Sequence, residues 1–381
     1  MEFEIDQAKF LSALSLAQTV ADKRSTMPVL ANVLLRATSE GQVVCSATDM
    51  MISLTERMGA EVHGTGSLTL AVKHLHGVIR TLDEGGVRLK SLDNHWAEIV
   101  AGKSEFKLMG MPENDFPELP DPKGLPFSEV PTHVLADLLH KTQFSVSTDE
   151  ARLNLNGVLF ECDGKQGTMV STDGHRLTKI TCDLPGPVLD KGIIIPRKGM
   201  LEMRRVLDRA ELGVDLAVGE QHLFLRAGDL LLSVKLNNVA FPPYQQVIPG
   251  AHERRVLAVR NDLVHALRRA EVMAPEKTAT VRLHLESGKL ELTADNPDLG
   301  AAHQEIEVEY EGEGLTAGFN ARYLLEVLEA VGVHGFPRRA RSLRASPGRG
   351  CRLPRRGDAH AHLSRRNRWR FAGFPSGTTE T

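Results

Sequence analysis

The sequence predicts an α+β protein built from three repeats, each with two helices packed on antiparallel strands. The first observation is an Asp that follows a short strand once in every 123 residues or so: Asp49, Asp173 and Asp295 lie 124 and 122 residues apart. The second is helical spacing of apolar residues twice in each repeat, and the third is alternation of polarity between those helices. A repeat this long forms a domain, because it is long enough to bury its own core.

Two further landmarks keep the same spacing. A strand runs into a helix at residues 70–73, 195–198 and 318–321. A Phe-Pro turn stands at 116–117 and again at 241–242, which places a third turn in the mid-360s, where none is present. The third repeat is therefore predicted to be incomplete.

Each repeat is expected to begin with a helix, around residues 10–17, 134–139 and 263–270, where apolar side chains recur at spacings of three and four. Asp6, Thr132 and Asn261 are suitable N-caps for these helices. A second helix is expected near 75–82, 200–207 and 324–328. Segments such as 29–35, 158–162, 223–235 and 290–294 read as strands separated by Gly, Asp and Asn turns.

Pro-rich stretches at 116–131 and 242–250 fall where the repeat predicts a boundary. We therefore predict domains at 1–122, 128–249 and 250–334, the last of them truncated. Residues 335–381 form an Arg-rich tail in which no strand is expected. The tail replaces sequence that the third domain needs, so we expect a destabilised third domain with an unpaired sheet edge.

The tail admits two interpretations. It is a disordered basic extension that binds DNA electrostatically, or it is the product of a reading-frame slip near codon 335. Abundant Arg, Gly, Pro, Ser and Ala without any Lys is typical of a GC-rich gene read out of frame. Because the tail stands in place of the third domain's last strands, we favour the slip.

The net charge of −3 conceals a division. The tail holds twelve Arg and two acidic residues, which leaves 34 basic and 47 acidic residues in positions 1–334. An acidic body repels nucleic acid unless its basic groups gather on one face.

Several classes of function are excluded on sequence grounds. No phosphate-binding loop, dinucleotide fingerprint or metal-ligand cluster is present, so no cofactor and no metal are predicted. Asp173, His175 and Arg176 lack a nucleophile and are interpreted as a structural turn, not a catalytic site. We expect a protein that is not an enzyme. No signal peptide and no apolar run near about 20 residues is found, which predicts a cytoplasmic protein without a membrane partner.

Four motifs together resemble the bacterial sliding clamp family, the beta subunit of DNA polymerase III. They are Thr-Asp-Gly-His-Arg-Leu at 172–177, Ile-Ile-Ile-Pro-Arg-Lys-Gly at 193–199, Phe-Pro-Pro-Tyr at 241–244 and Gly-Phe-Asn-Ala-Arg-Tyr-Leu-Leu at 318–325. The resemblance runs from Met1 to about Val333 and implies three clamp domains, with two protomers closing head to tail into a ring around duplex DNA. Symmetry agrees, since repeated units with a heterologous interface form a closed ring when the rotation fits.

The resemblance also implies that the helices line the hole and contact DNA. The basic residues expected there are Arg24, Lys73, Arg80, Lys141, Arg197, Lys198, Arg205, Arg268 and Arg269. Attraction to phosphates without base readout holds DNA and still permits sliding. From charge alone the same residues fit solvated helix faces equally well.

A second site implied by the resemblance is a cleft that captures short peptides of the polymerase III catalytic subunit, the clamp loader and other proteins with a clamp-binding motif. Its matching residues are Leu155, Thr172, Gly174, His175, Arg176, Leu177, Pro242 and Val247. Such a site needs apolar surface with a few polar groups. The family's remaining wall is an apolar Met-Pro-Met-like ending that this chain lacks.

The family's protomer interface pairs an aromatic residue of the first domain with aliphatic residues of the third, which matches Phe106 against Val272 and Met273. Because the third domain is expected to be incomplete, we expect weak dimerisation. The alternative function is a monomeric, ring-incompetent module that derives from a clamp and binds peptides through its middle domain. Dimer formation and retention on circular DNA distinguish the two.

Overall fold

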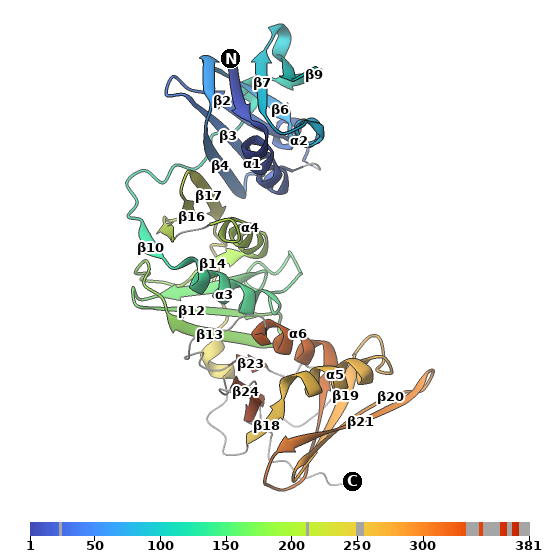
Figure 1. Cartoon of the computed structure of the whole chain (residues 1–381). Coiled ribbons are helices and arrows are strands. Elements are labelled where there is room, and N and C mark those ends of the chain that lie inside the picture. Colours follow the sequence, from blue (N-terminus) through green and yellow to red (C-terminus); the bar gives the residue numbers. More distant parts are fainter. Residues whose placement is uncertain are drawn as a thin grey trace. The chain divides into compact units, whose positions relative to one another are not determined.

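The computed structural model describes residues 1–22, 25–210, 213–248, 255–332, 343–345, 359–363 and 368–372 (Figure 1). The chain divides into two compact units. The first unit contains residues 1–133, 185–187 and 198–236, and the second contains residues 134–184, 188–197 and 237–381. In the described residues helices accompany antiparallel sheets, so the predicted α+β class is confirmed.

The first repeat has its two helices packed against each other and against its strands. Its elements are β1 (Glu2–Asp6), α1 (Gln7–Val20), β2 (Asn32–Ala37), β3 (Gln42–Thr48), β4 (Ile52–Gly59), β5 (Glu61–Gly64), β6 (Gly66–Ala71), α2 (Val72–Thr81), β7 (Gly86–Ser91), β8 (Trp96–Ala101) and β9 (Ser104–Met111).

The second repeat contributes strands to both units. Its elements are β10 (Ser128–Val130), α3 (Thr132–Gln143), β11 (Gly157–Cys162), β12 (Gln166–Thr172), β13 (Leu177–Asp183), β14 (Ile193–Pro196), α4 (Arg197–Leu207), β15 (Val214–Val218), β16 (His222–Ala227) and β17 (Leu230–Lys235).

The third repeat lies wholly in the second unit. Its elements are β18 (Arg255–Val259), α5 (Arg260–Glu271), β19 (Thr280–Glu286), β20 (Lys289–Asn296), β21 (Gly300–Glu309), β22 (Leu315–Asn320) and α6 (Ala321–Gly332), followed by the short strands β23 (Leu343–Ala345), β24 (Ala359–Leu363) and β25 (Arg368–Ala372).

The helices form where the apolar spacing predicts them. In α1 the side chains of Phe10, Leu14 and Ala17 are fully buried, and Asp6 caps the helix by accepting a hydrogen bond from the backbone N–H of Lys9 at 3.0 Å. The predicted cap at Asn261 is wrong, because that residue lies inside α5.

The first unit holds one continuous sheet that crosses from the first repeat into the second. Its strand order is β10-β15-β16-β17-β4-β3-β2-β6-β9-β8-β7-β1-β5. The crossing is the β17–β4 ladder, which pairs Leu230 with Glu56 at one end and Val234 with Ile52 at the other.

The second unit holds two sheets. The first has the order β13-β12-β11-β14, and the second has the order β22-β19-β20-β21-β18-β25-β24-β23. The third repeat buries a core of its own between the larger sheet and its helices, which includes Leu267, Val281, Leu292 and Leu328.

Strands in the Arg-rich tail were not expected, and that expectation is wrong for three short segments. β25 pairs with β18, β24 pairs with β25, and β23 pairs with β24. The sequence signal was present in the alternation of Ala359-His360-Ala361-His362 and of Arg368-Trp369-Arg370-Phe371. The remainder of the predicted tail lies outside the described residues.

Within the part of the chain that the structure describes, no helix is both long enough and apolar enough to span a bilayer.

Candidate functional site

The predicted cleft residues centre on the turn between β12 and β13, which Asp173 organises. Its Oδ1 accepts hydrogen bonds from the backbone N–H groups of His175 and Arg176 at 2.9 and 3.0 Å. The hydroxyl of Thr172 donates to the carbonyl of Arg176 at 2.7 Å and accepts from the N–H of Gly174 at 3.1 Å. Gly174 has a φ of +90°, which side chains rarely tolerate. The turn is fixed by its own polar groups.

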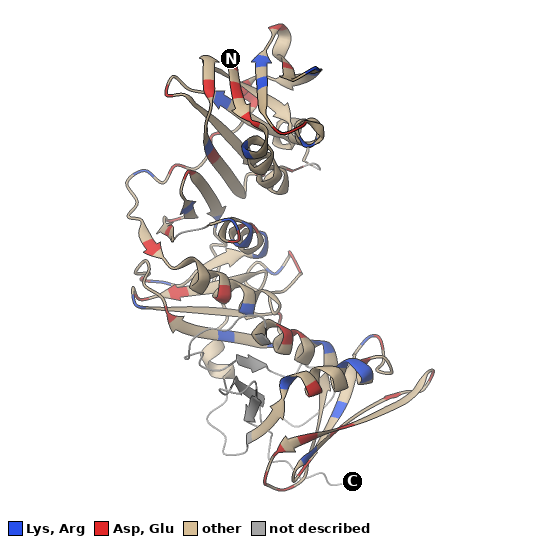
Figure 2. Cartoon of the chain, viewed as in Figure 1, with Lys and Arg blue, Asp and Glu red and all other residues tan. Residues whose placement is uncertain are grey.

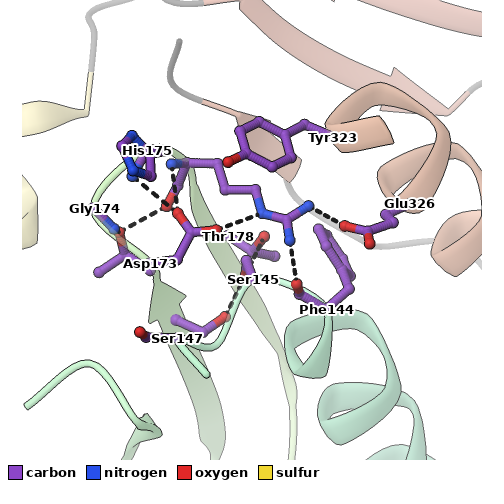
Figure 3. Close-up of polar contacts among 12 residues, drawn as sticks. Phe144, Ser145, Ser147, Asp173, Gly174, His175, Thr178, Tyr323 and Glu326 are labelled. Atoms are coloured by element: carbon purple, nitrogen blue, oxygen red, sulfur yellow. Dashed lines mark hydrogen bonds and ion pairs between the residues drawn. The ribbon is translucent and has the colours of Figure 1, made fainter. Parts of the chain in front are cut away.

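Arg176 lies at the centre of a contact network between the second and third repeats. Figure 3 labels four of the residues that it contacts, Phe144, Asp173, Tyr323 and Glu326. Its side chain is 8% exposed, and its Nε donates to Asp173 Oδ2 at 3.0 Å. Nη2 donates to the carbonyl of Phe144 at 2.5 Å, and Nη1 is paired with Glu326 of α6. The guanidinium also lies 4.3 Å from the ring centre of Tyr323. These contacts occupy the guanidinium, whereas Gly174 and His175 of the same turn are exposed.

An apolar cluster lies beneath the turn. Leu177 packs there with Leu159, Val170, Ile194 and Tyr244. Burial and then the hydrogen bond to Glu161 raise the pKa of Tyr244 to about 12, so this phenol stays neutral.

Two other predicted cleft residues flank Tyr244 in sequence. Pro242 is half-buried, and Val247 is 53% exposed at the end of a short 3-10 helix. Leu155 is buried after α3, where its carbonyl accepts from the backbone N–H of Ser147 at 3.0 Å.

Several residues of this region were not singled out in the sequence. Phe144, Tyr323 and Glu326 surround Arg176, and Phe241 and Ile248 border the apolar cluster. Phe241 and Tyr244 belong to the Phe-Pro-Pro-Tyr motif, which signalled them. Tyr323 belongs to the motif at 318–325, but Glu326 carried no local signal, because Arg176 and Glu326 are 150 residues apart.

The helices are more basic than the rest of the chain (Figure 2). Together the six described helices hold twelve Lys and Arg against six Asp and Glu, in a body whose residues 1–334 carry a net charge of −13. The predicted DNA contacts that are exposed on them are Lys73, Arg80, Lys198, Arg205, Arg268 and Arg269, while Arg197 is half-buried.

Two predicted DNA contacts differ from this set. Lys141 is 8% exposed and its Nζ is bound to Asp137 at 2.5 Å, so it is not part of an exposed basic surface. The sequence did not indicate that Lys141 is buried, because its charge is the same as that of exposed helix residues. Arg24 lies outside the described residues.

Arg269 donates to the side-chain oxygen of Gln304 at 3.0 Å, and the other five exposed basic residues fall into two groups. Lys198 is paired with Asp49, Arg205 with Glu202, and Arg268 with Glu329 at 2.8 Å. Within the described residues, by contrast, Lys73 and Arg80 of α2 have no acidic partner. The first group must exchange partners to bind a phosphate, whereas α2 presents free cations.

The three predicted interface residues lie near the surface. Phe106 is half-buried in β9 opposite Ile99 of β8. Val272 follows α5 and is 71% exposed, while Met273 packs against the core of the third repeat. That core is formed by the described residues, so Val272 and Met273 stand on a packed surface.

Comparison with known families gives three matches in sequence order. The N-terminal domain of the DNA polymerase III beta subunit matches residues 1–120, the central domain matches residues 129–243, and the C-terminal domain matches residues 245–334.

Relatives named "Beta sliding clamp" align with most of the chain. The protein of Proteus mirabilis is 33% identical over 333 residues, which cover 87% of this chain and 90% of that protein. The protein of Caulobacter vibrioides is 36% identical over 335 residues, which cover 86% and 90% of the two chains.

Solved structures agree. The crystal structure of the DNA polymerase III subunit beta from Pseudomonas aeruginosa has a TM-score of 0.86 at 29% identity and covers 98% of this chain and 99% of its own. A second structure from that organism, a sliding clamp bound to griselimycin, also has a TM-score of 0.86 at 29% identity, with 98% of each chain covered.

Proposed function

The chain belongs to the family of the DNA polymerase III beta subunit, the bacterial sliding clamp, and on this premise we propose that it acts as a ring-shaped processivity factor. It is not an enzyme. It encircles duplex DNA as a head-to-tail dimer and tethers the replicative polymerase and other partners that carry a clamp-binding peptide. We place this activity in the cytoplasm, where a bacterial chromosome is copied.

The observation that carries the proposal is the run of three clamp domains in one chain, matched in order from residue 1 to residue 334. Three quasi-equivalent domains with a heterologous interface close into a six-domain ring when two copies meet. A closed ring holds DNA by topology, so the grip needs no base contacts.

We propose that the helices face the DNA. The supporting charges are the exposed Lys73, Arg80, Lys198, Arg205, Arg268 and Arg269, together with the half-buried Arg197. Attraction to phosphates is independent of sequence and weakens as salt rises, which allows the ring to slide. The acidic strands outside the helices disfavour binding of DNA elsewhere on the protein.

We propose that partner peptides bind at the turn between β12 and β13. The exposed backbone of Gly174 and the side chain of His175 offer polar contacts, and Leu177 with Pro242 and Val247 offers apolar surface nearby. A peptide with two or three apolar residues fits this chemistry. The buried side chain of Arg176 holds the turn in place through its contact with Asp173.

The test of the function is retention on DNA. The purified chain is loaded by its clamp loader onto a nicked circular plasmid and passed through a sizing column in high salt, which removes electrostatic binding. We expect the protein to travel with the circle and to be lost after the plasmid is linearised. Equal loss from both forms would contradict the proposal and would favour a monomeric peptide-binding module.

A further inference from the structure

The turn between β12 and β13 in the second repeat has a duplicate in the first repeat, the turn between β3 and β4. Asp49 Oδ1 accepts from two backbone N–H groups of its own turn at 2.9 and 2.6 Å, as Asp173 Oδ1 does in the second repeat. In each turn the preceding threonine, Thr48 or Thr172, donates to a carbonyl and accepts from an N–H group. The two turns therefore show which residues of the neighbouring strands are equivalent.

Near each turn, four paired residues form a row across neighbouring strands, and cross-strand partners share one face of a sheet. In the second repeat the row runs over β13, β12, β11 and β14 and contains Lys179, Val170, Leu159 and Ile194. In the first repeat the row runs over β4, β3, β2 and β6 and contains Thr55, Ser46, Leu34 and Thr69. The same fold thus carries two different sets of side chains at four matching places.

The row of the first repeat consists mainly of hydroxyl groups that are satisfied inside that repeat. The hydroxyls of Ser46 and Thr55 lie 3.2 Å apart, and Thr69 donates to the carbonyl of Met111 at 3.0 Å. The fold therefore requires neither a cation nor an apolar pair at these places. Because the second repeat replaces three of the four residues, the replacements point to a task that belongs to the second repeat alone.

The row of the second repeat combines buried apolar side chains with one charge. Val170, Leu159 and Ile194 are at most 6% exposed, and all three belong to the apolar cluster beneath the turn. Lys179 is half-buried on β13, the last strand of this sheet in the described residues. Strand alternation places it on the same face as Leu177, another member of the cluster. A cation therefore stands at the edge of the apolar surface.

Tyr244 holds this cation in place without neutralising it. The Nζ of Lys179 lies 5.3 Å from the centre of the Tyr244 ring, within the range of a cation–π contact. The hydroxyl of Tyr244 donates to Glu161 at 2.9 Å. Lys179 and Glu161 thus contact different parts of the same side chain, the ring and the hydroxyl, and they form no ion pair with each other.

The charge of Lys179 is available, unlike that of two other cations near the turn. Arg176 is bound by Asp173 and its other acceptors, and Nε of Arg152 lies 3.1 Å from Asp149. Lys179 has no carboxylate partner among the described residues. Residues 241–248, which include Tyr244, contain no charged side chain. The apolar surface at the turn therefore has a single unpaired cation at its edge.

We propose that Lys179 determines specificity at the peptide site, because its ammonium group binds a carboxylate of the partner peptide. This inference rests on the proposed peptide site and adds the charge that the partner carries there. Lys179 and Leu177 are two residues apart on one strand, or about 7 Å. Alternate side chains of an extended peptide have the same spacing. The preferred peptide therefore has an Asp or Glu two positions from an apolar residue.

The test compares peptides that differ in one charge. A display library of short peptides is selected for binding to the full chain, and the tightest peptide is labelled with fluorescein. It is then made with Asp, Asn or Lys two positions from an apolar residue, and dissociation constants are measured by fluorescence anisotropy. We expect the Asp peptide to bind about fivefold more tightly than the Asn peptide, as for a partly exposed ion pair, and the Lys peptide to bind most weakly. The preference should shrink as salt is added.

Variants of Lys179 assign the preference to this side chain. Lys179→Met should bind the Asp and Asn peptides equally, and Lys179→Glu should prefer the Lys peptide. Lys179→Arg keeps the charge and the stacking on Tyr244, so it should keep the preference for Asp. The matched control is Lys165→Glu, which makes the same change of charge at an exposed residue of the β11–β12 turn and should also keep the preference. Each preference is a ratio measured on one protein, so partial unfolding of a variant does not produce it.

The outcomes separate this inference from the proposed function. Equal affinity of the unchanged protein for the Asp and Asn peptides would overturn the role of Lys179 and leave the peptide site standing. A preference for Asp that persists in Lys179→Met would do the same. Failure of every peptide in the library to bind would overturn the proposed peptide site together with the role of Lys179.

Discussion

The contact between the first and second repeats is built differently from the contact between the second and third repeats. These two contacts are called the first and the second joint. In the first joint β4 pairs with β17 along five residues, from Ile52–Val234 to Glu56–Leu230. Side-chain contacts between the two repeats, such as that of Lys198 with Asp49, add to this backbone pairing. The second joint has no such ladder in the described residues, because β13 is the last strand of its sheet and β23 lies near it without pairing. There the contact is concentrated on Arg176. Backbone pairing distributes the contact over many groups, whereas a side-chain joint depends on a few.

The largest effect is expected from Arg176→Ala. Its removal leaves Asp173 Oδ2 and the carbonyl of Phe144 without their donor and takes away the stacking on Tyr323, so we expect the free energy of unfolding of the second unit to fall by about 3 kcal/mol. The measurement is urea denaturation together with hydrogen exchange, which should show faster exchange in α6. The matched control is Arg176→Lys, which keeps the charge but not the planar fork and is expected to recover part of the loss. Unchanged exchange in α6 would contradict the role of Arg176.

A smaller effect is expected from Thr19→Val in the first joint. Valine keeps the shape but removes the hydroxyl that donates to Glu202, a carboxylate whose side chain is 4% exposed. The expected loss is about 1 kcal/mol, because Arg205 still binds the same carboxylate and the β4–β17 ladder persists. Ser15→Ala on the exposed side of α1 is the control for loss of a hydroxyl. A loss as large as that of Arg176→Ala would remove the contrast between the joints.

Lys198→Ala removes a single ion pair of the first joint, the one with Asp49, and measures how much that pair adds to the β4–β17 pairing. Its side chain is 48% exposed, so we expect a loss of only about 0.5 kcal/mol in the free energy of unfolding. The effect should shrink as salt is added, because the pair is partly screened. Thermal unfolding at low and high salt measures both. If high salt did not reduce the effect, the pair would be more buried than its exposure indicates.

The first joint also contains a pH-dependent carboxyl. Burial raises the pKa of Glu56 above its ordinary value of 4.5, against the opposing effect of Arg209. The folded state therefore keeps this proton at pH values where the unfolded chain has released it, and the stability gained from the protonated group is lost as pH rises through the raised pKa. Relative to Glu56→Gln, the unchanged protein should gain stability as pH is lowered toward 4.5. Urea denaturation of both proteins between neutral and acidic pH measures this. A constant difference would contradict the burial of the carboxyl.

Local sequence signals predicted much of this molecule. Helical spacing located all six described helices, and the repeated Asp located the polar turns at 49 and 173. Period-two alternation located β11, β16, β17, β20 and part of β2, and it was missed at Ala359–Leu363 and Arg368–Ala372, where Arg and His obscured it.

Contacts between distant segments were not predictable in the same way. Nothing near Arg176 in sequence indicates Glu326 or Tyr323, since their meeting depends on how the third repeat packs. The burial of Lys141 was equally hidden, because its charge matches that of exposed helix residues. Comparing the repeats recovers some of this information, because Lys73, Lys198 and Arg322 each stand at the second residue of α2, α4 and α6.

The central claim is that two copies of this chain close into a ring, and sedimentation equilibrium of the full chain tests it most directly. The chain has a mass of 41.8 kDa. We expect the average mass to rise with concentration toward twice that value and to stop there, as a closed dimer requires. A mass of 41.8 kDa at every concentration, or growth beyond the dimer into open chains, would contradict the ring.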